Sequence, residues 1–262
     1  MDAHSTMKRP VLTIAKYTCI EAARNRIFAL LLVGIIGIFA LGEFIGELAI
    51  AETSSTQAAI LAFILRITAV IITALYVVSS VLREFNDKTI NLFIALPVPR
   101  HTYYFGKLAG FCLLSVIITL VASLPIWIYA EPSQVVLWQV GLLFELLIVV
   151  AVCLFFIFTL ENMPVAVTSV IAFYLLSRTI STMILIGQSP ILESTDLSQK
   201  FINFFLHLIA FALPALDRFT RTDWLVYGNG SVSDLAFMAV QSVIYLFLLG
   251  AAALFDLYRK NF

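Results

Sequence analysis

The strongest constraint in this sequence is a series of long apolar stretches, each of the length that crosses a lipid bilayer. Hydrophobic residues occupy 61% of the 262 positions and charged residues 12%, whereas a soluble domain has about 45–50% and about 25%. Backbone polar groups in lipid must bond within their own segment, so we expect these stretches to be helices. The sequence therefore predicts an all-α membrane protein with a single transmembrane domain over residues 1–262. Six spans are expected, at about residues 27–50, 58–82, 106–129, 135–160, 165–187 and 235–257.

The distribution of basic residues sets the expected orientation. With a cytoplasmic N-terminus and six spans, the cytoplasmic segments contain Lys8, Arg9, Lys16, Arg24, Arg26, Arg83, Lys88, Arg100, Lys107, Arg259 and Lys260. The outer segments contain Lys200, Arg218 and Arg221. Because cytoplasmic loops are richer in Lys and Arg, we expect both termini in the cytoplasm.

Residues 8–26 have the period of an amphipathic helix. One side would carry Val11, Leu12, Ala15, Thr18, Cys19 and Ala22, and the opposite side Arg9, Thr13, Lys16 and Arg24. A helix with basic residues on its polar face is suited to the headgroup layer of a membrane. The alternative is a solvated helix that precedes the first span.

Residues 188–234 are expected at the outer face, between the fifth span and the last. Within them, residues 201–216 form a further apolar run, about 24 Å long as a helix and shorter than a bilayer core of about 30 Å. The run also contains Asn203, His207 and Pro214. We expect it to be re-entrant or interfacial, because a seventh span would move the C-terminus across the membrane.

Residues 83–100 are the most polar segment between two apolar stretches. Pro97 and Pro99 cannot continue a helix and force an extended exit. The pattern predicts a short amphipathic helix whose exposed face could receive a cytoplasmic partner; the alternative is an ordinary connecting loop. One face of that helix would carry Phe85, Thr89, Leu92, Phe93 and Leu96.

This segment reads R-E-x-x-x-x-T-x-x-x-x-x-x-L-P-x-x-R, followed by G-K. The pattern resembles the loop after the second span of ABC-2 type transporter permeases, and is most similar to the six-span permeases linked to copper-enzyme maturation and gliding. That family usually has Gly before the Thr, where this chain has Lys88. The matching positions are Arg83, Glu84, Thr89, Leu96, Pro97, Arg100, Gly106 and Lys107.

The resemblance implies a coupling helix at residues 83–100 that docks onto a cytoplasmic ABC ATPase, and an elbow helix at residues 8–26. It also implies a bacterial inner-membrane location, a permease homodimer and contact with membrane lipids. ATP and Mg would be bound by the ATPase partner, with no cofactor on this chain. The expected coupling residues are Arg83, Glu84, Phe85, Thr89, Leu92, Phe93, Leu96, Pro97 and Arg100, with Glu161 in the short turn between the fourth and fifth spans.

Ionisable residues inside the spans are a second candidate site, because an unpaired charge there costs several kcal/mol. They are Glu43, Glu47, Arg66, Glu145 and Arg178, all expected in the outer half of the membrane. We expect Glu47 to pair with Arg66, and Glu145 with Arg178. They would line a polar cavity between two subunits, or else form structural ion pairs and snorkel to the outer surface.

Pro214 and Phe219 resemble a Pro-x-x-x-x-Phe stretch before the last span of the same permeases, where it belongs to the outer gate. Trp224 and Tyr227 nearby suit an interfacial aromatic belt. The alternative is a membrane-surface loop anchored by these aromatic residues.

Other chemistries lack their motifs in this sequence. No phosphate-binding G-x-x-x-x-G-K-[ST] loop occurs, and the histidines and cysteines have no metal-site or disulfide spacing. The net charge of +0 says nothing about partners, but no basic face is concentrated enough for nucleic-acid binding, which is not expected. The expected function is the permease subunit of an ATP-driven exporter and not an enzyme. The alternatives are a membrane enzyme acting on lipid or peptide, and a non-transporting scaffold.

Overall fold

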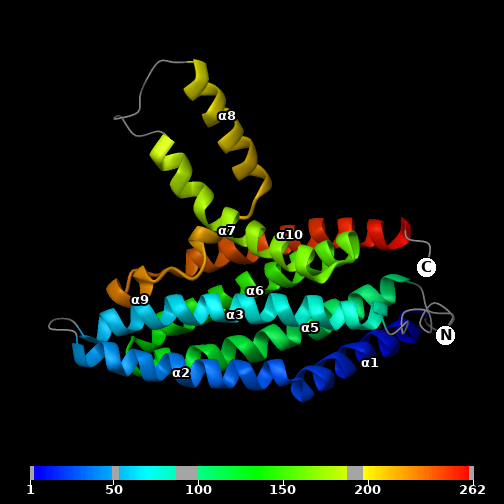
Figure 1. Ribbon diagram of the computed structural model, residues 1–262, viewed down its shortest axis with the longest axis horizontal. Helices are drawn as coiled ribbons and strands as arrows, with labels where there is room; N and C mark the ends of the chain where they lie inside the picture. Colours follow the sequence, from blue (N-terminus) through cyan, green and yellow to red (C-terminus); the bar gives the residue numbers. More distant parts are fainter. Residues whose placement is uncertain (1–2, 49–52, 87–99, 188–196, 260–262) are drawn as a thin grey trace.

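The computed structural model describes residues 3–48, 53–86, 100–187 and 197–259, and within these ranges it contains helices and no strands (Figure 1). This confirms the all-α class. The elements are α1 (Ala3–Arg24), α2 (Arg26–Leu48), α3 (Thr53–Asn86), α5 (Arg100–Ser123), η1 (Leu124–Ile128), α6 (Pro132–Leu160), α7 (Met163–Gly187), α8 (Leu197–Ala212), η3 (Leu216–Arg218), α9 (Asp223–Tyr227) and α10 (Val232–Arg259).

Several of these helices are long and apolar enough to cross a membrane. In the part of the chain that the structure describes there are five, namely Ser54–Asn86, Arg100–Ile128, Pro132–Leu160, Met163–Ile186 and Val232–Arg259. The first predicted span coincides with α2, whose 23 residues are about 35 Å long. The apolar stretch of α2 with described side chains covers Val33–Phe44. These helices indicate a multi-pass membrane protein.

The predicted re-entrant run corresponds to a bent pair of helices. The segments Phe201–Ala212 and Leu216–Tyr227 meet at 66°, with Pro214 in the break between them. After the second segment, the Gln134 side chain donates to the Gly228 carbonyl at 3.3 Å and accepts from the Gly230 N–H at 3.1 Å. These bonds place the start of α10 beside the start of α6. The bend is compatible with a re-entrant segment and with a broken span, so the re-entrant interpretation stays a prediction.

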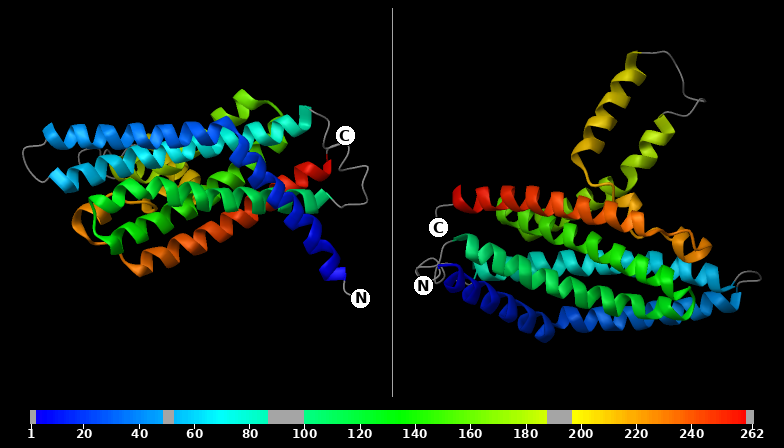
Figure 2. Two further views of the ribbon diagram at one scale, coloured as in Figure 1. Left: turned by 90° about the horizontal axis from the view of Figure 1, so that it is seen from below. Right: turned by 180° about the vertical axis from the view of Figure 1, so that it is seen from behind.

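The helix α6 is the centre of the bundle. It contacts α3, α5, α7 and α10, and Trp138, Leu142, Leu146 and Phe158 along it are 0% exposed. A helix that is apolar all round is expected in such a position. Around α6 the long helices run side by side, and α1 crosses α5 obliquely (Figure 2).

The end of α7 and the whole of α8 form a hairpin that projects from this bundle (Figures 1 and 2). The helix α8 packs on α7 and exposes large apolar side chains, with Phe204 64% and Phe211 89% exposed. The hairpin placement was not predicted, because the apolar pattern of residues 201–216 sets only the character of the helix.

One boundary, the end of the second predicted span, differs from the sequence prediction near the segment 83–100. The second span was predicted to end near residue 82, but α3 continues to Asn86, because nothing in Leu82–Asn86 breaks a helix. Arg83, Glu84 and Phe85 therefore belong to the last turn of α3, and their assignment to a separate short helix was wrong. The other predicted coupling residues Thr89, Leu92, Phe93, Leu96 and Pro97 lie outside the described residues.

The N-terminal amphipathic helix also differs from its prediction in two respects. It begins at Ala3 rather than near residue 8, and Leu12 is 74% exposed although its pattern grouped it with the apolar side. The packed face is instead centred on Ile14, Thr18 and Ala22, because these residues meet α5 or lie in the core.

Candidate functional site

Two buried polar clusters stand out in this otherwise apolar bundle. The first, the Glu145 cluster, joins three helices and the segment after η3. It comprises Arg66 of α3, Glu145 of α6, Tyr174 and Arg178 of α7, and Thr220.

The Glu145 side chain is 0% exposed, and three polar side chains bond to its carboxylate. Arg178 lies 3.3 Å from it as an ion pair, and the Tyr174 hydroxyl donates to it at 2.7 Å. The Thr220 hydroxyl donates to its other oxygen. The predicted pairing of Glu145 with Arg178 is confirmed.

Arg178 and Arg66 also hold the backbone that follows α8. Arg178 donates to the Leu216 carbonyl at 2.7 Å, and Arg66 donates to the Thr220 carbonyl at 3.2 Å. Thr220 has a positive φ of 34°, a backbone conformation that a β-branched residue adopts only when its surroundings enforce it. The cluster therefore fixes this turn against α3, α6 and α7.

The remaining predicted intramembrane residues lie apart from these bonds. Glu43 accepts a hydrogen bond from the Tyr129 hydroxyl at the end of η1. The side chain of Glu47 lies outside the described side chains, so its pairing with Arg66 stays a prediction. Pro214 is buried and Phe219 is 0% exposed in the core beside the cluster, and the gate role of both stays a prediction.

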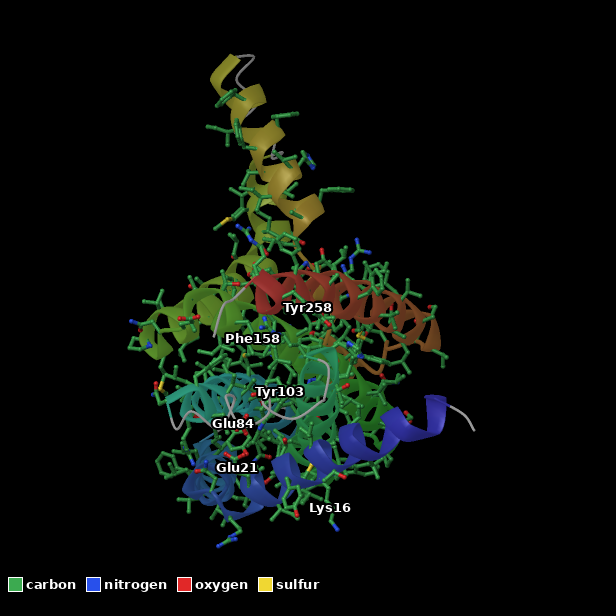
Figure 3. The ribbon with its side chains drawn as sticks, turned by 90° about the vertical axis from the view of Figure 1, so that its right-hand side faces the viewer. Lys16, Glu21, Glu84, Tyr103, Phe158 and Tyr258 are labelled. Atoms are coloured by element: carbon green, nitrogen blue, oxygen red, sulfur yellow. The ribbon has the colours of Figure 1, made fainter. Side chains whose placement is uncertain are left out.

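The second cluster, the α1–α3–α5 cluster, lies near the end of the bundle where the chain begins and ends (Figure 3). It comprises Glu21 of α1, Ser80 and Glu84 of α3, and Tyr103 and Lys107 of α5. The Lys107 side chain is only 3% exposed; it forms a close ion pair with Glu84 and lies 3.9 Å from Glu21. Tyr103 donates to Glu84 at 2.6 Å, and Ser80 donates to Glu21 at 3.2 Å.

Helical spacing explains why these side chains meet. Ser80 and Glu84 are four residues apart, as are Tyr103 and Lys107, so each pair lies on one face of its helix. The two faces are apposed where α3 ends and α5 begins, and the Lys107 ammonium also lies 5.6 Å from the Phe111 ring centre. A buried lysine is thus held by carboxylates on two neighbouring helices.

Glycine residues allow α1 to reach this cluster. A Cβ added at Gly106 would lie 2.8 Å from Ile14 Cβ, and one at Gly110 would lie 2.7 Å from Thr18 Cβ. Such close approach is the use of small residues four apart in membrane helices. The Cys19 thiol faces the Gly110 carbonyl at 3.5 Å, and burial raises the pKa of this thiol.

The described coupling residues occupy different environments around the same end of the bundle. Glu84 is directed between helices, whereas the Arg83 side chain is 53% exposed. Phe85 packs edge-on against Phe158 with ring centres 5.9 Å apart. Arg100 donates to the Leu257 carbonyl at 3.0 Å and so joins the start of α5 to the end of α10. Glu161 is an exposed, left-handed C-cap of α6.

Sequence reasoning missed Glu21, Tyr103 and the structural role of Lys107. The available signal was the pair Gly106 and Gly110, which predicts a closely packed helix beside α5. Within the described residues, no group of three or more His, Cys, Asp or Glu side chains could hold a metal ion. Comparisons with protein-family models and with curated proteins give no match.

Proposed function

We propose that this chain is the membrane subunit of an ATP-driven exporter of the ABC-2 permease type, working with a separate cytoplasmic ATPase that binds ATP and Mg. The observation that carries the proposal is a set of bonds between the end of α3 and the start of α5. Glu84 of α3 accepts a hydrogen bond from Tyr103 of α5 and forms an ion pair with Lys107 of α5. These are the helices that flank residues 87–99, the segment whose pattern resembles a coupling helix.

The lengths of the flanking helices support this role. The apolar helix Ser54–Asn86 has 33 residues and Arg100–Ile128 has 29, so they are about 50 Å and about 44 Å long. Both exceed a bilayer core of about 30 Å, and both therefore extend beyond it. A displacement of residues 87–99 by the ATPase would therefore be transmitted to α3 and α5, because these two helices are continuous and bonded to each other.

The helix α3 connects these bonds to the Glu145 cluster. The helix α3 carries Ser80 and Glu84 near one end and Arg66 deep in the bundle, and it has no break between them. A displacement of α3 would therefore reach the turn at Thr220, which Arg66 holds. In the proposed mechanism, ATP-driven closure of the partner shifts the spans between two packings, and substrate shifts that balance only by differential affinity.

The projecting hairpin supports a second copy of this chain as a further partner. Phe201, Phe204 and Phe211 of α8 are 64% exposed or more, and such a face must be covered by lipid or protein. Two copies would then enclose a transport pathway between them in the inner membrane of a bacterium.

Affinity purification from native membranes in mild detergent tests the proposal. We expect a P-loop ATPase to co-elute in stoichiometric amount. We also expect this chain to stimulate ATP hydrolysis by that ATPase. The Lys107→Met variant should stimulate it less, whereas the exposed-site control Lys16→Gln should stimulate it as the unmodified chain does. If no ATPase co-elutes under conditions that keep a known transporter intact, the enzyme and scaffold alternatives would replace this proposal.

A further inference from the structure

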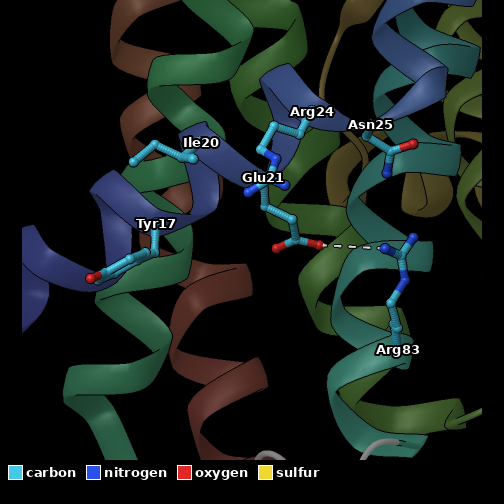
Figure 4. Close-up of a pocket in the computed structure, with 6 residues that line it drawn as sticks. All are labelled: Tyr17, Ile20, Glu21, Arg24, Asn25 and Arg83. Atoms are coloured by element: carbon cyan, nitrogen blue, oxygen red, sulfur yellow. Dashed lines mark ion pairs between the residues drawn. The ribbon is translucent and has the colours of Figure 1, made fainter.

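A pocket with charged side chains in its lining lies between the second half of α1 and the last turn of α3, beside Asn25 at the junction of α1 and α2. Its volume is about 470 Å³ and it is open on one side. Figure 4 shows the end of α1 on one wall and α3 on the other. The lining residues are Tyr17, Ile20, Glu21, Arg24, Asn25 and Arg83.

The pocket is lined by two arginines, Arg24 and Arg83, and one carboxylate, Glu21, so cationic groups outnumber anionic groups. Arg83 lies 4.0 Å from the Glu21 carboxylate, which is the outer limit of an ion pair. That carboxylate also accepts a hydrogen bond from the Ser80 hydroxyl and lies 3.9 Å from the Lys107 ammonium. Among the described residues, no acceptor lies within hydrogen-bond distance of Arg24. The Arg83 guanidinium is therefore only loosely paired with Glu21 and the Arg24 guanidinium has no paired carboxylate within the described part of the chain, which leaves donors for an added oxyanion.

The depth of the pocket matches the headgroup layer of a membrane. Arg24 is the last residue of α1 and lies two residues before α2, which has no charged residue from Ile27 to Gly42. Along the lipid-facing side of α2, Leu30 is 64% exposed and Val33 is 65% exposed. A phosphate bound by Arg24 and Arg83 would thus lie at the end of α1, a few residues before an exposed apolar stretch of α2 that suits an acyl chain.

The aromatic and apolar lining extends this match. Tyr17 is 68% exposed and Ile20 is 41% exposed, so both present an apolar surface beside the arginines. Tyrosine favours the boundary between headgroups and acyl chains, because its ring is apolar and its hydroxyl is polar. Free phosphate would use the arginines but gain nothing from this surface.

We propose that the pocket binds the phosphate of an anionic phospholipid, with Arg24 and Arg83 as its ligands and the acyl chain along Ile20 and α2. The site holds α1 to the membrane at the level of the α1–α3–α5 cluster. It does not depend on the proposed transport activity, and its test needs no ATPase.

Native mass spectrometry of the full-length chain from zwitterionic detergent tests this site. Phosphatidylglycerol is titrated against phosphatidylcholine and against inorganic phosphate. We expect phosphatidylglycerol to bind preferentially, and the double variant Arg24→Gln with Arg83→Gln to weaken that binding roughly tenfold or more. The matched control, Lys16→Gln with Arg259→Gln, removes two exposed cations outside the pocket and should bind as the unmodified chain does.

Three results would overturn the proposal. Unchanged phosphatidylglycerol binding by the Arg24 and Arg83 double variant would exclude these ligands. An equal loss in the control pair would reduce the effect to overall charge. Inorganic phosphate that displaces the lipid at comparable concentration would assign the pocket to a soluble anion.

Discussion

At the scale of single residues, Glu145 has the environment in which a side chain is hardest to replace. It is 0% exposed and pairs with Arg178 at 3.3 Å, while Tyr174 and Thr220 donate to it. Glu145→Ala would leave the partly buried Arg178 guanidinium without its carboxylate. We expect the free energy of unfolding to fall by about 3–5 kcal/mol, measured by thermal unfolding in detergent with tryptophan fluorescence.

A double variant separates the ion pair from simple loss of packing. Adding Arg178→Met to Glu145→Ala removes the unpaired charge, so it should recover part of the lost stability. Glu131→Ala at an exposed position is the control and should change little. If the double variant is less stable than Glu145→Ala by the full cost of a second core substitution, the pair is not the source of the effect.

The thiol of Cys19 gives a residue-scale prediction for pH. Burial raises its pKa, and only the thiolate reacts with maleimide. At any given pH below that raised pKa, less thiolate is present than for an ordinary cysteine. We expect Cys19 to label more slowly than a cysteine introduced by Lys16→Cys, and its rate to rise at higher pH. The Cys19 rate is measured in a Cys112→Ser, Cys153→Ser background, and the Lys16→Cys rate in the same background with Cys19→Ser added. Equal pH profiles would contradict the burial of Cys19 against α5.

At the scale of elements, the fit of α1 against α5 depends on Gly110. An added Cβ would meet Thr18 Cβ at 2.7 Å and the Ala15 carbonyl at 3.2 Å, and a backbone atom cannot rotate away. We expect Gly110→Ala to lower the unfolding free energy by about 1–3 kcal/mol and to speed tryptic cleavage after Lys16.

Gly37→Ala provides the matched control, because nothing lies within 4 Å of a Cβ added there. It should leave stability and cleavage unchanged or slightly improve them, since alanine is the better helix former. An equal effect of both substitutions would show that the loss at Gly110 comes from something other than contact with α1.

The elements themselves were largely predictable, and the reason is physical. Apolar runs in lipid must be helical, so the approximate positions of the spans followed from the positions of the apolar runs in the sequence. Their ends were less predictable: nothing in the sequence of Leu82–Asn86 marks where the bilayer stops and helix α3 continues. The pairing of Glu145 with Arg178 was predictable because two buried charges at similar depth stabilise each other.

At the scale of the whole molecule, contacts between distant segments could not be predicted from the sequence. Glu21 reaches Ser80 and Lys107 only because α1 crosses α5 obliquely, an angle that no local pattern encodes. The α7–α8 hairpin is a similar case. Its apolar faces specify burial, but burial by lipid and burial by a second copy have the same sequence signature.

The arrangement of all the helices makes one global prediction, the side of the membrane on which each turn lies. Between Lys16 and Ser133 the chain passes through α2, α3 and α5, so these residues should lie on opposite sides. One further helix, α6, returns the chain to Asn162 on the side of Lys16. Beyond α7 the bent pair of helices should leave Ser231 on the side of Ser133, because Gln134 bonds Gly228 and Gly230.

Single cysteines at these four exposed positions, each in a cysteine-free background, can be labelled with a membrane-impermeant maleimide in intact cells. We expect labelling at Ser133→Cys and Ser231→Cys but not at Lys16→Cys or Asn162→Cys until the membrane is opened. Labelling of Ser133→Cys without Ser231→Cys would mean that the bent pair crosses the membrane. That outcome would place seven crossings in the chain, separate the two termini, and remove the six-span layout on which the resemblance to a permease depends.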